Sequence, residues 1–393
     1  IGLAVGLVLI AKVYFEQSYD DFYPDRDRVY QVWAKYQQNG GELKDYPQTS
    51  GGIAPTMQQQ IPEIETVTRY TSFGDWTFTM TDTKMKYSGR CIIADSCFFD
   101  ILPRPMLIGN AKEVLSTPMY VLISSRIAKN IGGDVIGKNF TVDNSPGRTM
   151  TIGGVFEEVP ENSHSRYDVI VSMASAGRFM WEGSPTNMLG NDRYISYVKL
   201  HKGVNPLALE EQVRTFVNSY FPPEEQQKVG LSIDFSFHKL DNLHKELPQV
   251  KRMTWILSLL AFALIFTAVM NYILIVISSI VNRSKEVAVH KCYGASENNI
   301  HGMMFGEALV HIVLSLILAL LLILAFRGTV EELLATSLDS LLLSNGSLVL
   351  LGICILVFFV SGFMPGSLYA RIPVASAFRN YRGNKRIWKK ALL

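Results

Sequence analysis

The residue patterns that could support chemistry in this chain are few, and each lacks a part that its chemistry needs. The segment Gly132-Gly-Asp-Val-Ile-Gly-Lys138-Asn139 fits the G-x-x-x-x-G-K pattern of a phosphate-binding loop. However, Asn139 stands where such a loop needs Ser or Thr to hold magnesium. The strand-like Phe140-Thr-Val142 follows, so no helix N-terminus is predicted there to bind phosphate. We therefore interpret the segment as a turn.

Patterns for metal ligands and nucleophiles are incomplete as well. The histidines form no H-E-x-x-H pattern, and no G-x-S-x-G occurs. His238 and His244 flank Asp241, an arrangement more typical of surface chemistry than of a metal site. The acidic pairs Tyr19-Asp-Asp21 and Asp25-Arg-Asp27 lack the Gly-centred loop and closing Glu of a calcium site. The sequence therefore predicts no catalytic residue, no metal site and no cofactor on this chain.

Charge is distributed unevenly along the 393 residues, whose length suits two or three structural units. The 37 basic and 35 acidic residues leave no basic surplus for a nucleic-acid partner. Beyond position 252, three stretches lack Asp, Glu, Lys and Arg altogether: 253–282, 308–326 and 340–370. Because a helix needs about 20 apolar residues to cross a bilayer, each stretch predicts a transmembrane helix. A wholly soluble enzyme and a disordered chain are excluded.

The start of the chain resembles part of a further span. Ile1–Ala11 carries no charge and is followed by Lys12. A signal-peptide core would need a basic start and a small-residue cleavage site, and neither is visible. We therefore expect a truncated first transmembrane helix, and four membrane helices in all.

Basic residues predict the orientation of these helices, since Lys and Arg favour the cytoplasmic side of short loops. The tail 371–393 holds seven of them, and the segment 283–307 holds Arg283, Lys285 and Lys291. The loop 327–339 holds one basic residue beside three acids. The tail and the 283–307 segment are thus expected in the cytoplasm, and the region between the first two helices outside it.

The fold class expected is an α+β extracytoplasmic domain inserted after the first helix of an α-helical membrane domain. The expected order is a partial first helix at 1–14, the external domain at 15–250, a second helix at 251–282, a cytoplasmic coupling loop or helix at 283–306, a third helix at 307–327, an external loop at 328–345, a fourth helix at 346–370 and a basic cytoplasmic tail at 371–393.

Within the external domain, strand and helix patterns alternate without a βαβ rhythm. Alternation or β-branched residues predict strands at Val29–Lys35, Thr66–Ser72, Lys86–Ala94, Thr149–Phe156, Asp168–Met173 and Tyr194–Leu200. The segment Asp143-Asn-Ser-Pro-Gly147 predicts a hairpin turn.

Two helices in this domain have start or stop signals. Ser124 is expected to begin one, which Gly132-Gly133 ends. Asn205 and Pro206 are expected to begin the other. The expected buried face of that second helix carries Leu209, Val213, Phe216 or Val217, and Tyr220.

The positions of the cysteines leave the formation of one disulfide undecided. Cys91 and Cys97 lie in the domain expected outside the cytoplasm, where a disulfide is feasible, although two buried thiols are favoured. Cys292 and Cys354 are expected in the cytoplasm and in a span, and neither should pair.

The cytoplasmic segment carries the most informative residues. Arg283-Ser-Lys-Glu-Val-Ala-Val-His-Lys-Cys-Tyr-Gly-Ala295 resembles the R-x-x-E-I-G-V-R-K-x-x-G-A motif of FtsX-like permeases. His290 replaces the usual Arg of that motif, and Ala288 replaces a usual Gly. The following segment 299–308 is similar to that family's I-x-x-x-F-x-x-E-A element, and Tyr369–Arg379 is similar to its closing A-x-x-P-V-x-A-L-R.

The external domain carries a second, independent resemblance. Ala94-Asp-Ser-Cys-Phe-Phe-Asp-Ile101 resembles the A-D-x-x-F-F-x-x-F element of the MacB-type periplasmic core domain. Ile136-Gly-Lys138, Gly154-Val-Phe156 and Pro160-Glu-Asn-Ser-His164 resemble its I-G-K, G-V-F and P-x-N-S-H elements in the same order. The segment Phe15–Phe22 resembles members from Bacteroidetes.

This resemblance implies a permease that moves as a lever, driven by a cytoplasmic ABC ATPase on which ATP and magnesium are bound. The expected coupling residues are Arg283, Lys285, Glu286, Val289, His290, Lys291, Gly294 and Ala295. The chain is expected to pair with a copy of itself or with a second permease half, to contact membrane lipid, and to meet a periplasmic adaptor or an outer-membrane partner. The inner membrane is the expected location.

Small and polar residues mark the expected helix contacts. Close approach is predicted at the G-x-x-x-G pairs Gly2 and Gly6, Gly302 and Gly306, and Gly362 and Gly366. Asn271 and His311 are polar residues within spans, for which helix-to-helix hydrogen bonding is favoured over a transport role.

Two functions remain open at this stage. One is a transporter subunit that exports a hydrophobic compound, a peptide or a lipoprotein. The other is a transmembrane signalling module that regulates a cell-wall hydrolase or senses a peptide. The size of the external domain favours transport, and the substrate cannot be read from the sequence.

Overall fold

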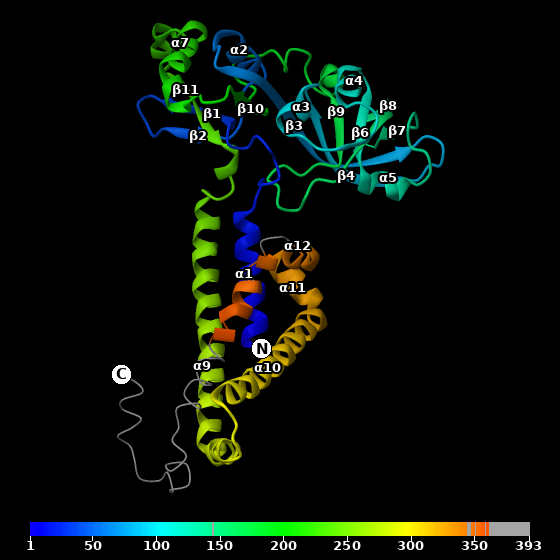
Figure 1. Cartoon of the computed structure of the whole chain (residues 1–393). Helices are drawn as coiled ribbons and strands as arrows, with labels where there is room; N and C mark the ends of the chain where they lie inside the picture. The colour runs from blue at the N-terminus through cyan, green and yellow to red at the C-terminus, as the bar shows by residue number, and fades with distance from the viewer. Residues whose placement is uncertain (144, 344–346, 350, 358, 361–393) are drawn as a thin grey trace. The chain divides into compact units, whose positions relative to one another are not determined.

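The computed structural model describes residues 1–360, with gaps at 144, 344–346, 350 and 358 (Figure 1). The chain divides into two compact units. The helical unit combines Ile1–Gln17 with Pro248–Leu393, and the sheet unit is Ser18–Leu247. The predicted basic tail, the end of the predicted fourth helix, Gly362 and Gly366 lie outside the described residues.

The sheet unit is built on a sheet of 11 strands in the order β11-β1-β10-β3-β4-β9-β6-β8-β5, with β2 paired to β1 and β7 paired to β3 and β8. The strands are β1 Val29–Gln38, β2 Lys44–Tyr46, β3 Ile64–Met80, β4 Lys86–Ala94, β5 Met106–Ile108, β6 Tyr120–Ser124, β7 Asn139–Val142, β8 Ser145–Phe156, β9 Val169–Ser172, β10 Ile195–Leu200 and β11 Leu231–Lys239. The β4–β9 and β6–β8 pairs are parallel, and the other described pairs are antiparallel.

Short helices lie between the strands. They are α2 Ile53–Gln60, α3 Phe98–Ile101, α4 Ala111–Ser116, α5 Ser125–Ile131, α6 Ala176–Phe179, α7 Glu210–Tyr220 and α8 Pro223–Val229, with 3₁₀ turns at Met173–Ser175, Pro206–Leu209 and Leu240–Asn242. A mixed sheet with short helices confirms the α+β prediction for this unit.

The predicted helix boundaries are confirmed. The Ser124 side chain accepts a hydrogen bond from Ile127 N, and Gly132 ends α5 with a φ of +75°. Asn205 accepts from Leu207 N, and Pro206 begins the 3₁₀ turn that leads into α7. These caps satisfy backbone groups that a helix end would otherwise leave without a partner.

All six predicted strands are present, and β4 has the predicted bounds. The predicted strand Thr66–Ser72 is too short, because β3 continues to Met80 through a register shift at Gly74, which has a φ of +74°. The predicted hairpin is confirmed, since β7 and β8 pair antiparallel with Thr141 opposite Thr149, but its turn is shorter than predicted because β8 begins at Ser145.

One predicted core residue is wrong. Phe216 and Val217 are both buried on α7, whereas Tyr220 is 40% exposed. Tyr220 is the last residue of the helix, and its hydroxyl accepts a hydrogen bond from Gln60 Nε2 at 3.2 Å instead of entering the core.

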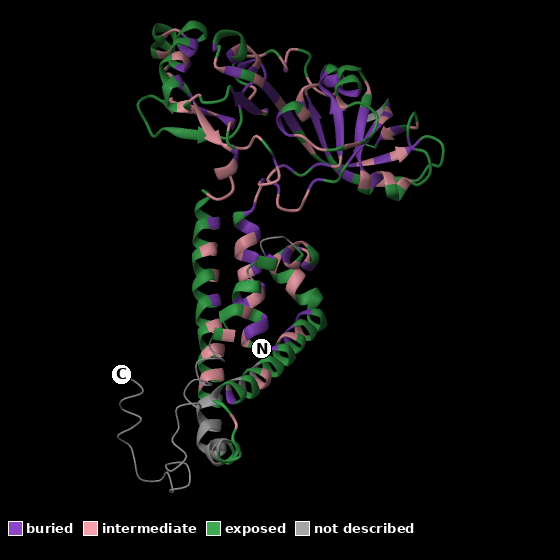
Figure 2. Ribbon diagram, viewed as in Figure 1, coloured by how far each residue is buried: buried purple, intermediate pink, exposed green. Residues whose placement is uncertain are grey.

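The central strands of the sheet unit are largely buried (Figure 2), and the side chains of their core are apolar. Val121, Ile123, Ile152, Val169 and Val171 form one part of this core and are at most 1% exposed. Cys91 is fully buried, and Cys97 donates from Sγ to Val67 O at 3.0 Å. Both thiols are free, as favoured from the sequence.

The helical unit contains α1 Gly2–Gln17, α9 Pro248–Cys292, α10 Glu297–Ala325, α11 Arg327–Leu334 and α12 Leu338–Leu342, followed by an apolar helix at Ser347–Val357. Helix α1 contacts α9, α10 and α12. Leu3, Ala4 and Val8 of α1 are buried against Ala319 and Ile323 of α10.

Two helical segments are long and apolar enough to cross a membrane, Pro248–Ile275 and Asn298–Ala325. They correspond to the predicted second and third spans. Helix α1 has 16 residues, and of the predicted fourth span the structure describes an apolar helix at Ser347–Val357.

Three boundaries differ from the prediction. The first helix does not end at position 14 as predicted. Lys12 within it is 6% exposed, its Nζ lies 2.6 Å from Glu16 Oε1, and it donates to Thr336 Oγ1 at 2.7 Å. Because these partners compensate the charge, α1 continues to Gln17. The coupling segment 283–306 has only a short break at 293–296, because α9 continues to Cys292 and α10 begins at Glu297. The region 328–345 holds α12 and most of α11.

Candidate functional site

The predicted coupling residues lie at one end of the helical unit, in the last turns of α9 and the turn that follows. Glu286, Val289 and His290 are exposed, and three- and four-residue spacing places them on one helix face. Tyr293 continues this face and is 88% exposed. The side chains of Arg283, Lys285 and Lys291 lie outside the described part of the structure.

The turn between α9 and α10 has a defined geometry. Gly294 has a φ of +88°, a conformation that favours glycine, and the half-buried Ala295 donates its N–H to His290 O at 3.0 Å. Ser296 then caps α10 by accepting from Asn299 N at 3.3 Å. The last turns of α9 and this turn together therefore present exposed charged, aliphatic and aromatic side chains.

The glycine pairs differ in their surroundings. A Cβ at Gly6 would lie 2.8 Å from Ile265 Cγ1 on α9, and one at Gly2 would lie 3.6 Å from Leu264 O. At Gly302 and Gly306, nothing among the described residues lies within 4 Å of such an atom. The first pair therefore permits close packing of α1 on α9, whereas the second has open space beside it among the residues that the structure describes.

Asn271 and His311 lie on the wall of one cavity in the helical unit. This cavity of about 480 Å³ is lined mainly by apolar side chains of α1, α9 and α10, with Thr267 and Ser315 adding hydroxyl groups. The two polar residues selected from the sequence are thus brought to the same place by the packing of α9 and α10.

The catalytic patterns rejected from the sequence have structural roles. Gly132, Gly133 and Gly137 all have positive φ values, and Asn139 begins β7, so the turn prediction is confirmed. The imidazole of His238 stacks on Trp33 with ring centroids 4.1 Å apart, and burial lowers its pKa. Within the described residues, no group of three His, Cys, Asp or Glu side chains is placed to hold a metal.

A buried polar cluster that the sequence did not reveal lies where the chain leaves α1. Asp20 is fully buried with a φ of +60°, and its Oδ2 lies 2.6 Å from His164 Nδ1. Ser163 Oγ donates to Asp20 Oδ1 at 2.9 Å, and His164 Nε2 forms a hydrogen bond with Tyr197 OH. The P-x-N-S-H element could have pointed to this cluster from the sequence, because it contains Ser163 and His164, two of the four residues.

Two other sequence elements that resemble those of the MacB-type core domain stabilise the sheet. Asp95 of the A-D-x-x-F-F element pairs with Arg69, whose N donates to Asp95 Oδ2 at 3.0 Å. Burial raises the pKa of Asp95, although the Arg69 charge and its hydrogen bonds act in the opposite direction. At Gly154 of the G-V-F element, a Cβ would lie 2.9 Å from Ile108 O and 2.8 Å from Leu122 Cδ2, so only glycine fits.

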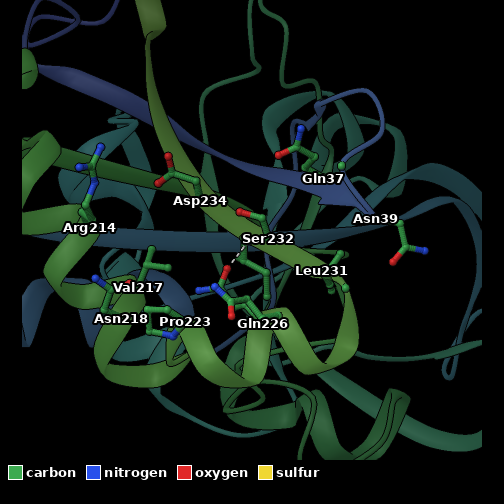
Figure 3. Close-up of a pocket in the computed structure, with 14 residues that line it drawn as sticks. Gln37, Asn39, Arg214, Val217, Asn218, Pro223, Gln226, Leu231, Ser232 and Asp234 are labelled. Carbon is green, nitrogen blue, oxygen red and sulfur yellow. Dashed lines mark hydrogen bonds between the residues drawn. The ribbon is translucent and has the colours of Figure 1, made fainter.

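A hollow of about 430 Å³ lies between the end of β1, α7, α8 and β11 (Figure 3). Amide side chains line much of it, with Arg214 and Asp234 as its charged residues. Gln226 is part of the framework, because its Nε2 donates to Phe221 O at 2.6 Å and its Oε1 accepts from Ile233 N at 3.0 Å. The hollow shows no arrangement of a nucleophile with a base.

Comparison with known proteins agrees with this architecture. The family model of the MacB-like periplasmic core domain matches residues 1–216, and that of the FtsX-like permease C-terminal domain matches residues 258–374. No curated protein matches the chain.

Among solved structures, a domain of a protein named as a permease, from Porphyromonas gingivalis, is 33% identical with a TM-score of 0.51, covering 55% of this chain and 91% of that one. The periplasmic region of MacB from Actinobacillus actinomycetemcomitans is 15% identical with a TM-score of 0.36, over 52% of this chain and 87% of that one. The extracellular domain of the ABC-type transporter YknZ from Gram-positive bacteria is 11% identical with a TM-score of 0.36, over 52% of this chain and 98% of that one.

The first family model spans more than half of the 393 residues, and the second covers most of the apolar helices that follow the sheet unit. The chain therefore belongs to the MacB/FtsX-like family of ABC transporter permeases.

Proposed function

We propose that this chain is the permease subunit of an ABC transporter that exports a hydrophobic compound, a peptide or a lipoprotein. In this proposal, ATP hydrolysis by a partner ATPase moves the helices and thereby the sheet unit, which lies outside the cytoplasm. Membership of the family supports the existence of a partner ATPase, since permeases of this family work with a cytoplasmic ABC ATPase. ATP and magnesium would bind to that partner.

One observation carries the proposal: α9 is a single helix of 45 residues from Pro248 to Cys292. At about 1.5 Å per residue it is roughly 67 Å long, which exceeds the thickness of a bilayer. It begins directly after Leu247, the last residue of the sheet unit, and ends in the predicted coupling residues. An unbroken helix resists bending, so a force on its far end reaches the sheet unit instead of being lost in a flexible loop.

The exposed face formed by Glu286, Val289, His290 and Tyr293, which we call the coupling surface, is the point at which that force would act. Glu286 and His290 offer charged or polar contacts, and Val289 and Tyr293 offer apolar area on the same face. Such a face is typical of an amphipathic helix that docks into a groove of another protein. Arg283, Lys285 and Lys291 belong to the same proposed surface.

The working assembly would hold more than one copy of this arrangement. We place four helices of each chain in the inner membrane, with the sheet unit on the periplasmic side. Among the described residues, the space beside Gly302 and Gly306 is open, which is compatible with a partner helix from a second copy or a second permease half. A periplasmic adaptor or an outer-membrane protein would then receive the exported compound.

The test compares two charge reversals in the full chain, reconstituted in lipid nanodiscs with a candidate partner ABC ATPase. Glu286→Lys changes the proposed coupling face, and the matched control Glu332→Lys changes an exposed acid on α11. We expect Glu286→Lys to reduce permease-stimulated ATP hydrolysis at least fivefold with membrane insertion intact, and Glu332→Lys to change it less than twofold. Equal rates in both variants would contradict the proposal.

The signalling alternative predicts a different partner for the sheet unit. Affinity capture with the full chain would recover an outer-membrane tunnel or an adaptor if the chain exports a compound. Recovery of a cell-wall hydrolase whose activity depends on ATP hydrolysis would support the regulatory function instead.

A further inference from the structure

The segment that leaves α1 is held by its backbone as well as by its side chains. Residues 18–23, which we call the exit segment, follow directly after Gln17 at the end of α1. Asp20 N donates to Asn162 O at 2.9 Å, and Asn162 Nδ2 donates to Ser18 O at 2.7 Å. Asp20 adopts a φ of +60°, which is uncommon for a residue other than glycine. A buried residue in such a conformation persists only where its surroundings hold it there.

The Asp20 carboxylate is the centre of this contact. A buried carboxylate is unfavourable unless donors surround it. Here the donors are Ser163 Oγ at 2.9 Å and His164 N at 3.4 Å, and His164 Nδ1 lies 2.6 Å from the second oxygen. His164 Nε2 forms a hydrogen bond with the hydroxyl of Tyr197, a fully buried residue of β10. The imidazole therefore connects the exit segment to a strand inside the sheet.

Tyrosines surround this connection. Tyr23, Tyr70, Tyr167 and Tyr197 are at most 4% exposed and belong to one core cluster. Burial raises the pKa of Tyr70 to about 12 and raises the pKa values of the other three as well, so all four hydroxyls remain neutral. Tyr70 OH and Ser165 Oγ lie 2.6 Å apart. The cluster thus combines a polar network with the apolar packing of the core.

The exit segment also contacts the residues that lead into α9. The rings of Tyr19 and His244 stack with centroids 3.4 Å apart. Lys245 Nζ lies 3.5 Å from Asp21 Oδ1, and Arg26 Nε lies 3.4 Å from Asp241 Oδ1. The two connections between the sheet unit and the helices are therefore tied together within the sheet unit.

We propose that Asp20, Ser163, His164 and Tyr197 form a latch that fixes the exit segment to β10, so that a displacement of α1 is transmitted to the sheet. These are positioning residues. Without the latch, residues 18–23 would act as a flexible linker and would absorb the displacement. The transmission role rests on the proposed function, whereas the latch itself is a property of the sheet unit.

Hydrogen exchange of the full chain in nanodiscs, without any partner, tests the latch. Asp20→Asn removes the buried charge at constant shape, and Tyr197→Phe removes only the hydroxyl. The matched controls, Asp134→Asn and Tyr120→Phe, change exposed residues of the same unit. We expect amides of residues 18–23 to exchange at least tenfold faster in Asp20→Asn and at least threefold faster in Tyr197→Phe, with both controls within twofold of the unsubstituted chain. Unchanged exchange in both latch variants would overturn the proposal.

A second measurement separates transmission from simple local order. With the ATPase present, ATP and vanadate are expected to change exchange in β10 of the unsubstituted chain. In Asp20→Asn this change should fall at least threefold, while the ATPase rate stays within twofold. If ATP and vanadate change the hydrogen exchange of β10 in Asp20→Asn as much as in the unsubstituted chain, the transmission role is overturned. If ATP and vanadate leave the hydrogen exchange of β10 unchanged in the unsubstituted chain, the result counts against the proposed function. The exchange of residues 18–23 measured without a partner still tests the latch in that case.

Discussion

Gly6 of α1 lies so close to Ile265 of α9 that a Cβ at position 6 would be 2.8 Å from Ile265 Cγ1. Real Cβ atoms are essentially never found at that distance, so the two helices approach closely because position 6 has no side chain. This contact joins the first and the longest helix of the helical unit, and it motivates the first of four predictions.

Gly6→Ala should destabilise the helical unit by about 1–3 kcal/mol, because the added methyl group overpacks the contact with Ile265. Gly2→Ala is the matched control, since its Cβ would make an ordinary contact 3.6 Å from Leu264 O. Gly2 is the first residue of α1 and gains less helix propensity than the interior Gly6, so the stability lost by Gly6→Ala relative to Gly2→Ala is a minimum measure of the packing effect. Unfolding of the full chain in mixed SDS micelles measures it. Equal stabilities of the two variants would show that α1 does not pack on α9 as described.

Lys12 and Thr336 should couple in a double-mutant cycle. Lys12 Nζ donates to Thr336 Oγ1 at 2.7 Å, and both residues are 6% exposed. A buried hydrogen bond from a charged donor contributes about 1.5–3 kcal/mol, so Lys12→Met and Thr336→Val should be non-additive by at least about 1.5 kcal/mol. The pair Lys12→Met and Thr329→Val provides a control in which the effects should add.

Arg69→Met should destabilise the sheet unit by about 1.5–3 kcal/mol, because it leaves the partly buried Asp95 carboxylate, whose side chain is 19% exposed, without its charged hydrogen-bond partner. The raised pKa of Asp95 already shows that burial opposes its charge. Asp95→Asn in the Arg69→Met background should recover part of the loss, since the uncompensated charge is then removed. The free energy of opening of β3 and β4, from hydrogen exchange of the full chain, measures both effects. A cost below about 1 kcal/mol, the range expected for the exposed control Arg178→Met, would contradict this account.

Asp25 should make the sheet unit sensitive to acid. Hydrogen bonds from Lys199 and Arg28 hold the pKa of Asp25 below its ordinary value of 3.8. A lowered pKa stabilises the folded state fully above that ordinary value, and the stabilisation is lost as the pH falls through the lower folded pKa. The stability difference between the unsubstituted chain and Asp25→Asn should therefore shrink as the pH falls through this range. A difference that stays constant with pH would exclude this role for Asp25.

Local patterns in the sequence were sufficient for much of the fold. The caps at Ser124 and Asn205, the hairpin at Asp143–Gly147 and six strands all depend on neighbouring residues, and all are present. Strand β11 could also have been predicted, because Leu231, Ile233, Phe235 and Phe237 alternate with polar residues. Strand β6 could not, since a strand of five residues with four consecutive buried ones carries no distinguishing period.

The candidate sites divide in the same way. The coupling residues fall within a single stretch of chain, so a local motif was enough to select them. Asp20 and His164 are 144 positions apart, and the sequence around Asp20 resembled only a weak acidic pair. The continuity of α9 through Arg283 and Lys285 was likewise hidden, because a charged segment after an apolar one is typical of a loop as well as of a helix.

By itself, then, the sequence determined the composition of the two units, their order, the family and the segment proposed to meet a partner, because these depend on hydrophobicity, local propensity and short motifs. Only the tertiary structure decided which polar residues are buried together: Asp20 with His164 and Tyr197, and Lys12 with Thr336. The physical reason is that the partners of a buried charge come from wherever the packed core brings donors and acceptors within about 3 Å, and that proximity is not encoded by position along the chain.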